Sequence, residues 1–289
     1  MDNFLIITNR EKDEDLRVSR KIESYIQKAG KHSFLSQTST ITDNTLLKDF
    51  IAKVECAIVL GGDGTIIQAA NDLMAYNIPI LGVNLGTVGF LAEIEEHHVE
   101  EALDNLFHDC HHVEKRLMIQ GEVIHHKQKP YDRKDNIHNA LNDIVITRKG
   151  FSRIISLGIY VNDQLVDDFR GDGVIISTPT GSTAYNLSAG GPIVISSANV
   201  MVITPICPHS LSPRSIVVSG DDHIKVAVRK SKKTQETEAY ASFDGNKEID
   251  LRTDDLISIR KARYDTKLIK LNNSGIYEVL RSKLGNNLN

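Results

Sequence analysis

The sequence has 289 residues and a formal net charge of −4, which argues against a nucleic-acid-binding protein because such proteins usually carry a basic surface. Hydrophobic residues make up 40% of the chain, yet no apolar run approaches the roughly 18 residues of a membrane helix, and the first residues lack the basic and apolar regions of a signal peptide. The three cysteines lie too far apart in sequence to indicate a zinc site or a disulfide framework, so we expect a cytoplasmic protein of one large or two ordinary domains.

The first 112 residues alternate short apolar runs with helical patterns. Residues 4–7 predict a buried strand, and apolar residues at helical spacing between 16 and 29 predict a helix that ends at Gly30. A second strand at 56–60 leads into a glycine-rich loop and a helix, and a third strand is expected at 78–83. Aliphatic strands separated by helices predict a Rossmann-like α/β domain with a parallel sheet over residues 1–112.

Short β-like runs separated by turn residues dominate from residue 113 onward, and they predict a β-sandwich domain over 113–270. The runs are 118–123, 140–147, 154–161, 173–178, 215–218, 224–228, 239–243 and 256–259. A long hairpin loop is expected at 125–138 and a charged turn at 229–238. Helical spacing of apolar residues at 275–284 predicts a closing helix within the C-terminal segment 271–289.

The loop after the second strand reads Gly61-Gly62-Asp63-Gly64-Thr65. Glycines let backbone N–H groups approach an anion, and the following helix adds its positive end, so this loop suits a phosphate. The carboxylate of Asp63 would repel that anion unless it binds a metal or accepts a proton. The alternative is a purely structural role, in which the loop is a tight turn and Asp63 only caps the helix. The chain contains neither the Walker A motif nor G-x-G-x-x-G, which disfavours a Walker-type ATPase and a dinucleotide-dependent oxidoreductase.

Two further segments carry polar groups next to predicted strands. The sequence TPTGSTAY at 178–185 offers hydroxyls, glycine and an aromatic ring, which suit a ribose and a base, although its composition also fits an ordinary surface loop. Asn142 and Asp143 precede an apolar strand and are by themselves a weak signal.

Taken together, these segments resemble the bacterial NAD kinases. The family's motifs occur in order over almost the whole chain, as GGDGT at 61–65, GTVGFL at 86–91, Asn142-Asp143, Asp172-Gly173, TPTGSTAYNLSAGGP at 178–192 and PHSLS at 208–212. Lipid kinases and phosphofructokinases carry relatives of the first motif, whereas the TPTGSTAY segment is specific to NAD kinases. The resemblance implies an α/β domain, a β-sandwich domain, a final segment that returns to the first domain, and a homotetramer with sites shared between subunits.

The same resemblance implies the reaction and its residues. The terminal phosphoryl group of ATP or polyphosphate, accompanied by Mg²⁺, is transferred to the 2′-hydroxyl of the adenosine ribose of NAD, so that NAD is a substrate and NADP the product. Asp63 matches the family's catalytic base. The NAD-contacting positions are matched by Asp63, Gly64, Asn142, Asp143, Arg153, Arg170, Asp172, Thr183, Ala184, Tyr185, Asn186, Leu187, Ser188, Cys207 and Asn246. Many family members have Asn-Glu where this chain has Asn142-Asp143, so one side chain is shorter here.

The sequence also contains patterns that only partly match other site types. The run His108-Asp109-Cys110-His111-His112 faintly resembles a zinc helix, but it has Asp for Glu and no obvious third ligand, so no protein ligand for a metal is assigned. No G-x-S-x-G motif supports a hydrolase. Two rivals stay open from the residues alone, namely a lipid or sugar kinase that shares only GGDGT, and a non-catalytic NAD-binding regulator.

Overall fold

The structure is a computed structural model that describes residues 1–36, 50–86, 89–126, 136–150, 154–210, 214–230, 238–271 and 281. The chain divides into two compact units. Unit 1 consists of Met1–Arg116 and Tyr264–Asn289, and unit 2 consists of Leu117–Arg263. No helix within the described residues is both long and apolar enough to cross a membrane.

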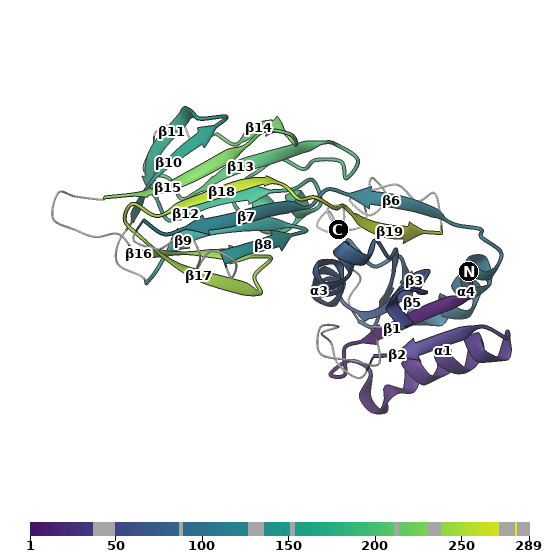
Figure 1. Cartoon of the computed structure of the whole chain (residues 1–289). Helices are drawn as coiled ribbons and strands as arrows, with labels where there is room; N and C mark the ends of the chain where they lie inside the picture. Colours follow the sequence, from purple (N-terminus) through teal and green to yellow (C-terminus); the bar gives the residue numbers. More distant parts are fainter. Residues whose placement is uncertain are drawn as a thin grey trace. The chain divides into compact units, whose positions relative to one another are not determined.

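Unit 1 is built on a seven-stranded sheet in the order β2-β1-β3-β4-β19-β6, with β5 paired to β4 (Figure 1). All paired strands run parallel except β6, which is antiparallel to β19. The central strands β3 and β4 are buried along their whole length, as expected for parallel strands with helices on both faces. The strands are β1 (Asn3–Thr8), β2 (His32–Leu35), β3 (Cys56–Gly61), β4 (Ile80–Asn84), β5 (Ile94–Glu95), β6 (His112–Arg116) and β19 (Thr266–Lys270).

The helices described in unit 1 are α1 (Arg17–Lys28), α3 (Asp63–Leu73) and α4 (Val99–Phe107). Helices α1 and α4 share one apolar cluster with Leu81 and Val83 of β4, whereas Ile66 of α3 lies against Gly82. Successive residues of a strand point to opposite faces, so α3 covers the face of the sheet opposite to α1 and α4. The carboxyl ends of β1, β3 and β4 are neighbours at one edge of this sheet, where ligands bind in folds of this kind.

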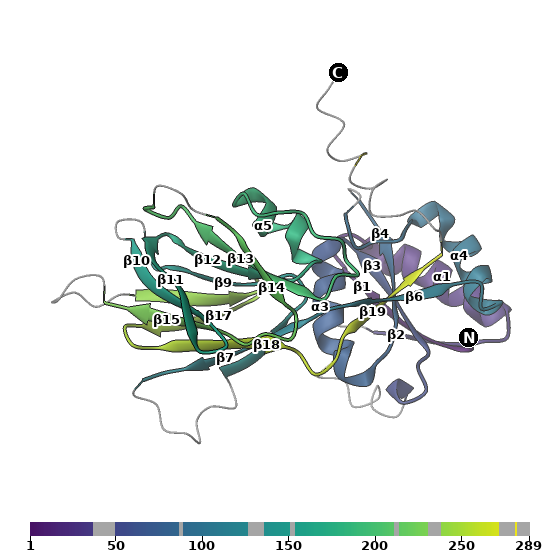
Figure 2. The same cartoon turned by 90° about the horizontal axis from the view of Figure 1, so that it is seen from above.

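Unit 2 consists of two six-stranded antiparallel sheets, with strand orders β11-β10-β15-β18-β7-β8 and β14-β13-β12-β9-β16-β17 (Figure 2). Strands of the first sheet alternate in burial, as in β7 and β15, whereas the central strands β12 and β9 of the second sheet are buried over most of their length. The strands are β7 (Ile119–Ile124), β8 (Ile137–Ala140), β9 (Asp143–Arg148), β10 (Ile155–Val161), β11 (Gln164–Gly171), β12 (Gly173–Ser177), β13 (Val200–Ile206), β14 (Ile216–Ser219), β15 (Ile224–Arg229), β16 (Glu238–Phe243), β17 (Lys247–Arg252) and β18 (Leu256–Lys261).

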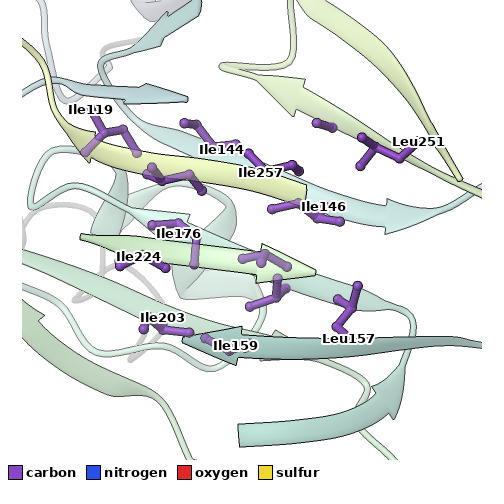
Figure 3. Close-up of a cluster of buried hydrophobic side chains, with 14 of the residues drawn as sticks. Ile119, Ile144, Ile146, Leu157, Ile159, Ile176, Ile203, Ile224, Leu251 and Ile257 are labelled. Carbon is purple, nitrogen blue, oxygen red and sulfur yellow. The ribbon is translucent and has the colours of Figure 1, made fainter. Parts of the chain in front are cut away.

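The core of unit 2 lies between the two sheets, where apolar side chains from both interdigitate (Figure 3). Ile119 and Ile257 come from the first sheet, and Ile144 and Ile176 from the second. All four are fully buried. This packing defines unit 2 as a β-sandwich.

The outer face of the second sheet carries the short helix α5 (Tyr185–Ser188). Ile144 and Ile146 of β9 point into the sandwich core, so Asp143 and Val145 point to the opposite, outer face. Val145, Ile175 and Ile206 form a separate apolar cluster there, against which Ala189 packs directly after α5. The residues that follow α5 therefore anchor the segment from 178 onward to this outer face.

The predicted fold class is confirmed, namely an α/β unit with a parallel sheet and a β-sandwich unit. The run 140–147, predicted as one strand, is two strands, β8 and β9, with a break at Leu141 and Asn142. The physical reason is that the side chain of Asp244 takes the backbone N–H groups at this break. The closing helix predicted within 275–284 falls, apart from Arg281, outside the described residues and stays a prediction.

Several strands escape prediction because they lie at sheet edges. Strands β2, β6, β11 and β17 are edge strands, and most of their exposed positions are polar or charged, with Val113, Leu165 and Val166 as exceptions, so they lack the long aliphatic runs that mark central strands. The edge strand β6 and the central strand β19, which was also not predicted, lie at the expected boundaries 112/113 and 270/271. Because β19 pairs with β4 and β6, both β6 and β19 belong to unit 1, and the structure divides the chain at 116/117 and 263/264.

Candidate active site

The loop between β3 and α3 holds the first group of predicted site residues. β3 ends at Gly61, Gly62 is extended, and Asp63 is the first residue of α3. The N–H groups of Thr65 and Ile66 bond to the carbonyl of Gly62, whereas the N–H groups at the first positions of a helix have no acceptor within that helix. The N–H groups at the first positions of α3, together with the helix dipole, attract an anion at this end of the helix.

The carboxylate of Asp63 is held by the second glycine-rich stretch. Its Oδ2 accepts the N–H of Phe90 at 2.8 Å and its Oδ1 accepts that of Leu91 at 3.1 Å. A β-carbon at Gly89 would overlap this carboxylate, so only glycine allows the stretch to pass so close. A carboxylate offers about four lone-pair positions, so Asp63 keeps acceptor capacity after these two bonds. The side chain is half-buried, and its orientation is set by backbone groups about 27 residues away.

In unit 2, Asn142 and Asp143 lie at the break between β8 and β9. The carboxylate of Asp244 accepts the N–H groups of Leu141 at 2.8 Å, Asn142 at 2.7 Å and Asp143 at 3.1 Å. Asp244 itself lies in the turn between β16 and β17, with a positive φ of 50°. This one side chain therefore sets the backbone conformation from which the Asn142 and Asp143 side chains project.

The environment of Asp143 changes its acidity. The residue is only 6% exposed. Burial, and secondly the neighbouring carboxylate of Asp244, raise the pKa of Asp143 to about 7. Among the residues that the structure describes, no group donates a hydrogen bond to its side chain. The carboxyl group of Asp143 therefore titrates near neutral pH.

The segment that begins at Thr178 packs directly on this break. The N–H of Thr178 bonds to the carbonyl of Asn142 at 2.8 Å, and its Oγ1 donates to the carbonyl of Leu141 at 2.5 Å. A β-carbon at Gly181 would overlap the carbonyl oxygen of Asn142. The glycine of the TPTG sequence is therefore required for contact between the two segments, which brings residues 142–143 and 178–183 into one site.

Asn186 is fully buried and holds the segment in place. Its Nδ2 donates to the carbonyls of Ser182 at 3.1 Å and Pro192 at 3.0 Å, and its Oδ1 accepts from Thr204 at 2.7 Å. The amide of Asn186 is thus used within the protein, and its hydrogen bonds position the neighbouring residues. Of these, Ser188 is exposed, and Thr183, Ala184 and Leu187 are half-buried.

Tyr185 is the first residue of α5. Its side chain is 47% exposed. Partial burial raises the pKa of Tyr185, and nearby Cys207, Tyr240, Asp143 and Asp172 raise it further. The aromatic ring is partly exposed, so it can stack against a planar ligand group.

The remaining predicted residues lie at the other end of β12 and β13. Asp172 bonds through Oδ1 to Nε of Arg148 at 2.6 Å, which orients one carboxylate oxygen toward the protein. Arg170 is exposed, and its carbonyl accepts the N–H of His209 at 2.7 Å. Cys207 is exposed with a positive φ of 42°. These three residues come from adjacent chain segments at one end of the sheet.

Two predicted residues stand apart. Asn246 is exposed in the turn between β16 and β17, close in sequence to Asp244. Arg153 lies outside the described residues. Within the described ranges, no three His, Cys, Asp or Glu side chains are grouped as metal ligands.

Sequence reasoning missed Asp244, which organises the site without being one of the recognised motifs. The signal was present in the sequence, because Asp244 and Gly245 form an Asp-Gly pair between two β-like runs, a pattern typical of hairpin turns. Gly245 also has a positive φ, of 70°. A turn of this kind places its aspartate beside the adjacent strand β9, where its side chain meets the break at Leu141 and Asn142.

Family models and curated relatives match this chain in both of its units, and all of them belong to one family. The family model described as the ATP-NAD kinase N-terminal domain matches residues 13–111, and the one described as the ATP-NAD kinase C-terminal domain matches residues 141–271. An NAD kinase from Lachnoclostridium phytofermentans is 49% identical over 286 residues, which cover 99% of each chain. An NAD kinase from Agathobacter rectalis is 40% identical over 289 residues, again 99% of each chain.

Two solved structures share the fold. Yeast NADH kinase in complex with NADH superposes with a TM-score of 0.81 at 22% identity, covering 100% of this chain and 89% of the yeast chain. An NAD kinase from Archaeoglobus fulgidus in complex with ATP superposes with a TM-score of 0.76 at 24% identity, covering 98% of both chains. At this level of identity the superpositions support the fold alone.

Proposed function

Because the chain belongs to the NAD kinase family, we propose that Asp63 is the base that accepts the proton of the adenosine 2′-hydroxyl of NAD. The activity is that of an NAD kinase, which converts NAD to NADP. NAD kinase domain models match both halves of the chain, so a lipid or sugar kinase, or a non-catalytic regulator, is not favoured. The observation that carries the proposed role of Asp63 is a carboxylate at the N-terminus of α3, held by the N–H groups of Phe90 and Leu91.

Phosphoryl transfer depends chiefly on alignment and on neutralising the charge of the moving group. In our proposal, the GGDGT loop at residues 61–65 binds phosphate oxygens through the backbone N–H groups at the first positions of α3. The bonds from Phe90 and Leu91 fix the carboxylate of Asp63, and its free lone pairs accept the proton as the 2′-hydroxyl attacks. Loss of a general base usually costs about 10²- to 10⁴-fold in rate, which sets the expected contribution of Asp63.

Asn142 and Asp143 would hold the adenosine ribose. The support is that Asp244 fixes their backbone while the Asp143 carboxyl group has no donor among the described residues. Tyr185 and the residues up to Ser188 would line the base and ribose, and Asp172 with Arg170 would contact the rest of the dinucleotide. Arg153, Cys207 and Asn246 complete the proposed set by resemblance.

NAD and ATP are the substrates, and we propose polyphosphate as an alternative donor and Mg²⁺ as the cation that accompanies either one. The Archaeoglobus relative was solved with ATP and the yeast relative with NADH. Asp63 is the single acidic residue of the GGDGT loop, and no cluster of three metal-ligating side chains occurs within the described residues. The donor's own phosphates would therefore provide most of the ligands of the cation.

Assembly and location follow the family resemblance in our proposal. A homotetramer would share its sites between subunits, with Arg170 and Asp172 contributing to the site of a neighbour. The exposure of the Arg170 side chain supports this role. The cytoplasm is the proposed compartment, because all three cysteines are free thiols, as is usual in a reducing environment. The final segment 271–289 is proposed to pack on unit 1.

The test is the variant Asp63→Asn, with formation of NADP from NAD and Mg-ATP as the activity and calorimetry as the measure of NAD binding. The variant keeps the size of the side chain, so turnover should fall about 10²- to 10⁴-fold while the NAD dissociation constant stays within a few-fold. Asp104→Asn makes the same change at an exposed position of α4 and should leave turnover unchanged. A large rise in the dissociation constant with unchanged turnover would make Asp63 a binding residue only.

A further inference from the structure

The loop that follows β1 lies beside the loop of Asp63. In the parallel sheet, Thr8 at the end of β1 pairs with Leu60 of β3, and Gly61 of β3 pairs with Asn84 of β4. The connections after β1, β3 and β4 are therefore neighbours at the carboxyl edge of the sheet. The connection after β1 carries none of the recognised motifs.

Asn9 attaches this connection to β3 by a backbone hydrogen bond. Its N–H bonds to the carbonyl of Leu60 at 2.9 Å, and its own carbonyl accepts the N–H groups of Lys12 at 3.0 Å and Asp13 at 2.9 Å. Its side-chain Oδ1 also accepts the N–H of Glu11 at 2.9 Å. The backbone around Lys12 is thus closed into a tight turn whose position follows that of β3.

Asp13 anchors the other end of the turn. Its side chain is buried and accepts hydrogen bonds from the N–H of Val18 at 2.9 Å, from the N–H and hydroxyl of Ser19, and from the hydroxyl of Thr8 at 3.2 Å. Burial alone would raise the pKa of Asp13, but these hydrogen bonds outweigh it and lower the pKa. A carboxylate held in this way fixes the turn between β1 and α1, with Lys12 immediately before it.

The side chain of Lys12 reaches both glycine loops. A β-carbon built at Gly62 would lie 3.1 Å from Nζ of Lys12, and one built at Gly86 would lie 3.6 Å from the same atom. The ammonium group is therefore beside the start of the GGDGT loop and beside the loop that follows β4. Among the residues that the structure describes, Lys12 forms no ion pair with a carboxylate.

These positions have an electrostatic consequence. The GGDGT loop must accept phosphate groups, each negatively charged, although it carries the carboxylate of Asp63. The backbone N–H groups and the dipole of α3 provide only partial positive charges. Lys12 places a full positive charge next to the same loop, and an ammonium group is a common ligand of phosphate oxygens.

We propose that Lys12 binds the phosphate chain of the phosphoryl donor at the loop of Asp63. The proposal rests on the proposed function in one respect, the assignment of that loop to phosphate. It identifies a donor-binding residue outside the recognised motifs, supplied by the connection between β1 and α1. The recognised chemistry is the phosphate chain itself, so ATP and polyphosphate should both depend on Lys12.

The test is Lys12→Met, which keeps the apolar length of the side chain and removes its charge. Loss of a charge-assisted hydrogen bond should lower kcat/KM for Mg-ATP about 10- to 100-fold, and for polyphosphate by a similar factor if it serves as donor. The NAD dissociation constant, measured by calorimetry without donor, should stay within about twofold of the wild-type value. Lys12→Arg keeps the charge and should recover most of the lost kcat/KM.

The matched control is Lys28→Met, the same substitution at an exposed position in the last turn of α1. Helix α1 has 12 residues, so Lys28 lies roughly 18 Å along the helix from its start, at about 1.5 Å per residue. This variant should keep the wild-type kcat/KM for the donor. Lys12 is exposed, so its loss should leave the melting temperature within a degree or two, and a lower activity would then not reflect unfolding.

Three results would overturn the proposal. They are an unchanged kcat/KM for the donor in Lys12→Met, a loss of NAD affinity in its place, or a loss that Lys12→Arg does not recover. The outcome is separable from that of Asp63→Asn, because one variant reports donor binding and the other proton transfer. If Asp63→Asn kept full turnover, the proposed base would be wrong, while a donor-specific defect in Lys12→Met would still locate phosphate at this loop.

Discussion

Asp143 and Asp244 are joined by two hydrogen bonds, although 101 residues separate them in sequence. The N–H of Asp143 bonds to Oδ1 of Asp244 at 3.1 Å, and the N–H of Asp244 bonds to the carbonyl of Asp143 at 3.0 Å. The turn after β16 and the start of β9 therefore form one rigid unit that presents Asn142 and Asp143. The same closeness brings two carboxyl groups together and contributes to the raised pKa of Asp143.

Asp244→Asn should weaken NAD binding, although Asp244 lies outside the recognised motifs. The amide keeps one acceptor oxygen but places an NH₂ group where the second accepted, so at least one N–H among residues 141–143 loses its partner. An unsatisfied buried donor costs about 1–3 kcal/mol, and the displaced loop should raise the NAD dissociation constant about tenfold. Calorimetry and thermal unfolding measure the two effects.

Asp250→Asn is the control for this variant. Asp250 is exposed on β17 and pairs with Lys149 at the surface, where an ion pair contributes little to stability. Both the NAD dissociation constant and the melting temperature should stay near their wild-type values. Equal NAD affinity in Asp244→Asn and Asp250→Asn would show that Asp244 does not position the site.

Stability should depend on pH through Asp143. Its pKa is raised from 3.8 to about 7 in the folded protein, so the folded state holds the proton more tightly than the unfolded state. The stabilisation that Asp143 contributes to the folded state is fully present below about pH 4 and is lost as the pH rises through 7. Asp143→Asn removes the titrating group, so its melting temperature relative to wild type should rise by several degrees between pH 4 and pH 8.

Asp167→Asn provides the reference, because it makes the same change at an exposed position of β11. Its melting temperature relative to wild type should not change with pH. If the melting temperatures of Asp143→Asn and wild type differed by the same amount from pH 4 to pH 8, Asp143 would not be the group that titrates near neutral pH.

Gly89→Ala should reproduce the loss of turnover expected for Asp63→Asn. The added β-carbon would overlap the carboxylate of Asp63, which must then leave the N–H groups of Phe90 and Leu91. The NADP-forming rate should fall at least tenfold. Gly86→Ala in the same stretch meets only an ordinary contact at 3.6 Å, so it should retain far more activity. Equal NADP-forming rates in Gly89→Ala and Gly86→Ala would show that this stretch does not orient the carboxylate of Asp63.

Shared sites can be tested with mixed oligomers. Chains carrying Asp63→Asn and chains carrying Asp172→Ala should each be nearly inactive alone. If each site combines Asp63 of one chain with Asp172 of another, a mixed dimer contains one doubly altered site and one intact site, by the symmetry of a closed homo-oligomer. Activity per mixed dimer should then return toward half of the wild-type value.

Two differently tagged chains allow the mixed assemblies to be purified and their composition verified. Each parent must also unfold at the wild-type temperature, since Asp172 pairs with Arg148 and its loss removes that contact. Confirmed mixed dimers without recovered activity would mean that each site is built within a single chain.

The sequence by itself determined the family and the two architectures. The motifs at 61–65 and 178–192 are contiguous, so their spacing is readable without a structure. The buried central strands β3 and β4 are runs of aliphatic residues, and this local pattern is enough to predict them. Edge strands such as β11 and β17 were not predictable, because most of their exposed positions carry polar side chains, as loops do.

Only the tertiary structure decided how the site residues are held. Sheet register brings Phe90 and Leu91 to Asp63, Asp244 to Asp143, and the turn after β1 to Gly62. Each contact joins segments that are tens of residues apart, so it depends on which strands are neighbours and at what register. The pKa of Asp143 depends on the same contacts, because burial and a second carboxylate raise it and neither is encoded next to residue 143. Local patterns specify strands, helices and motifs, whereas the chemistry of a carboxylate follows from what the fold packs around it.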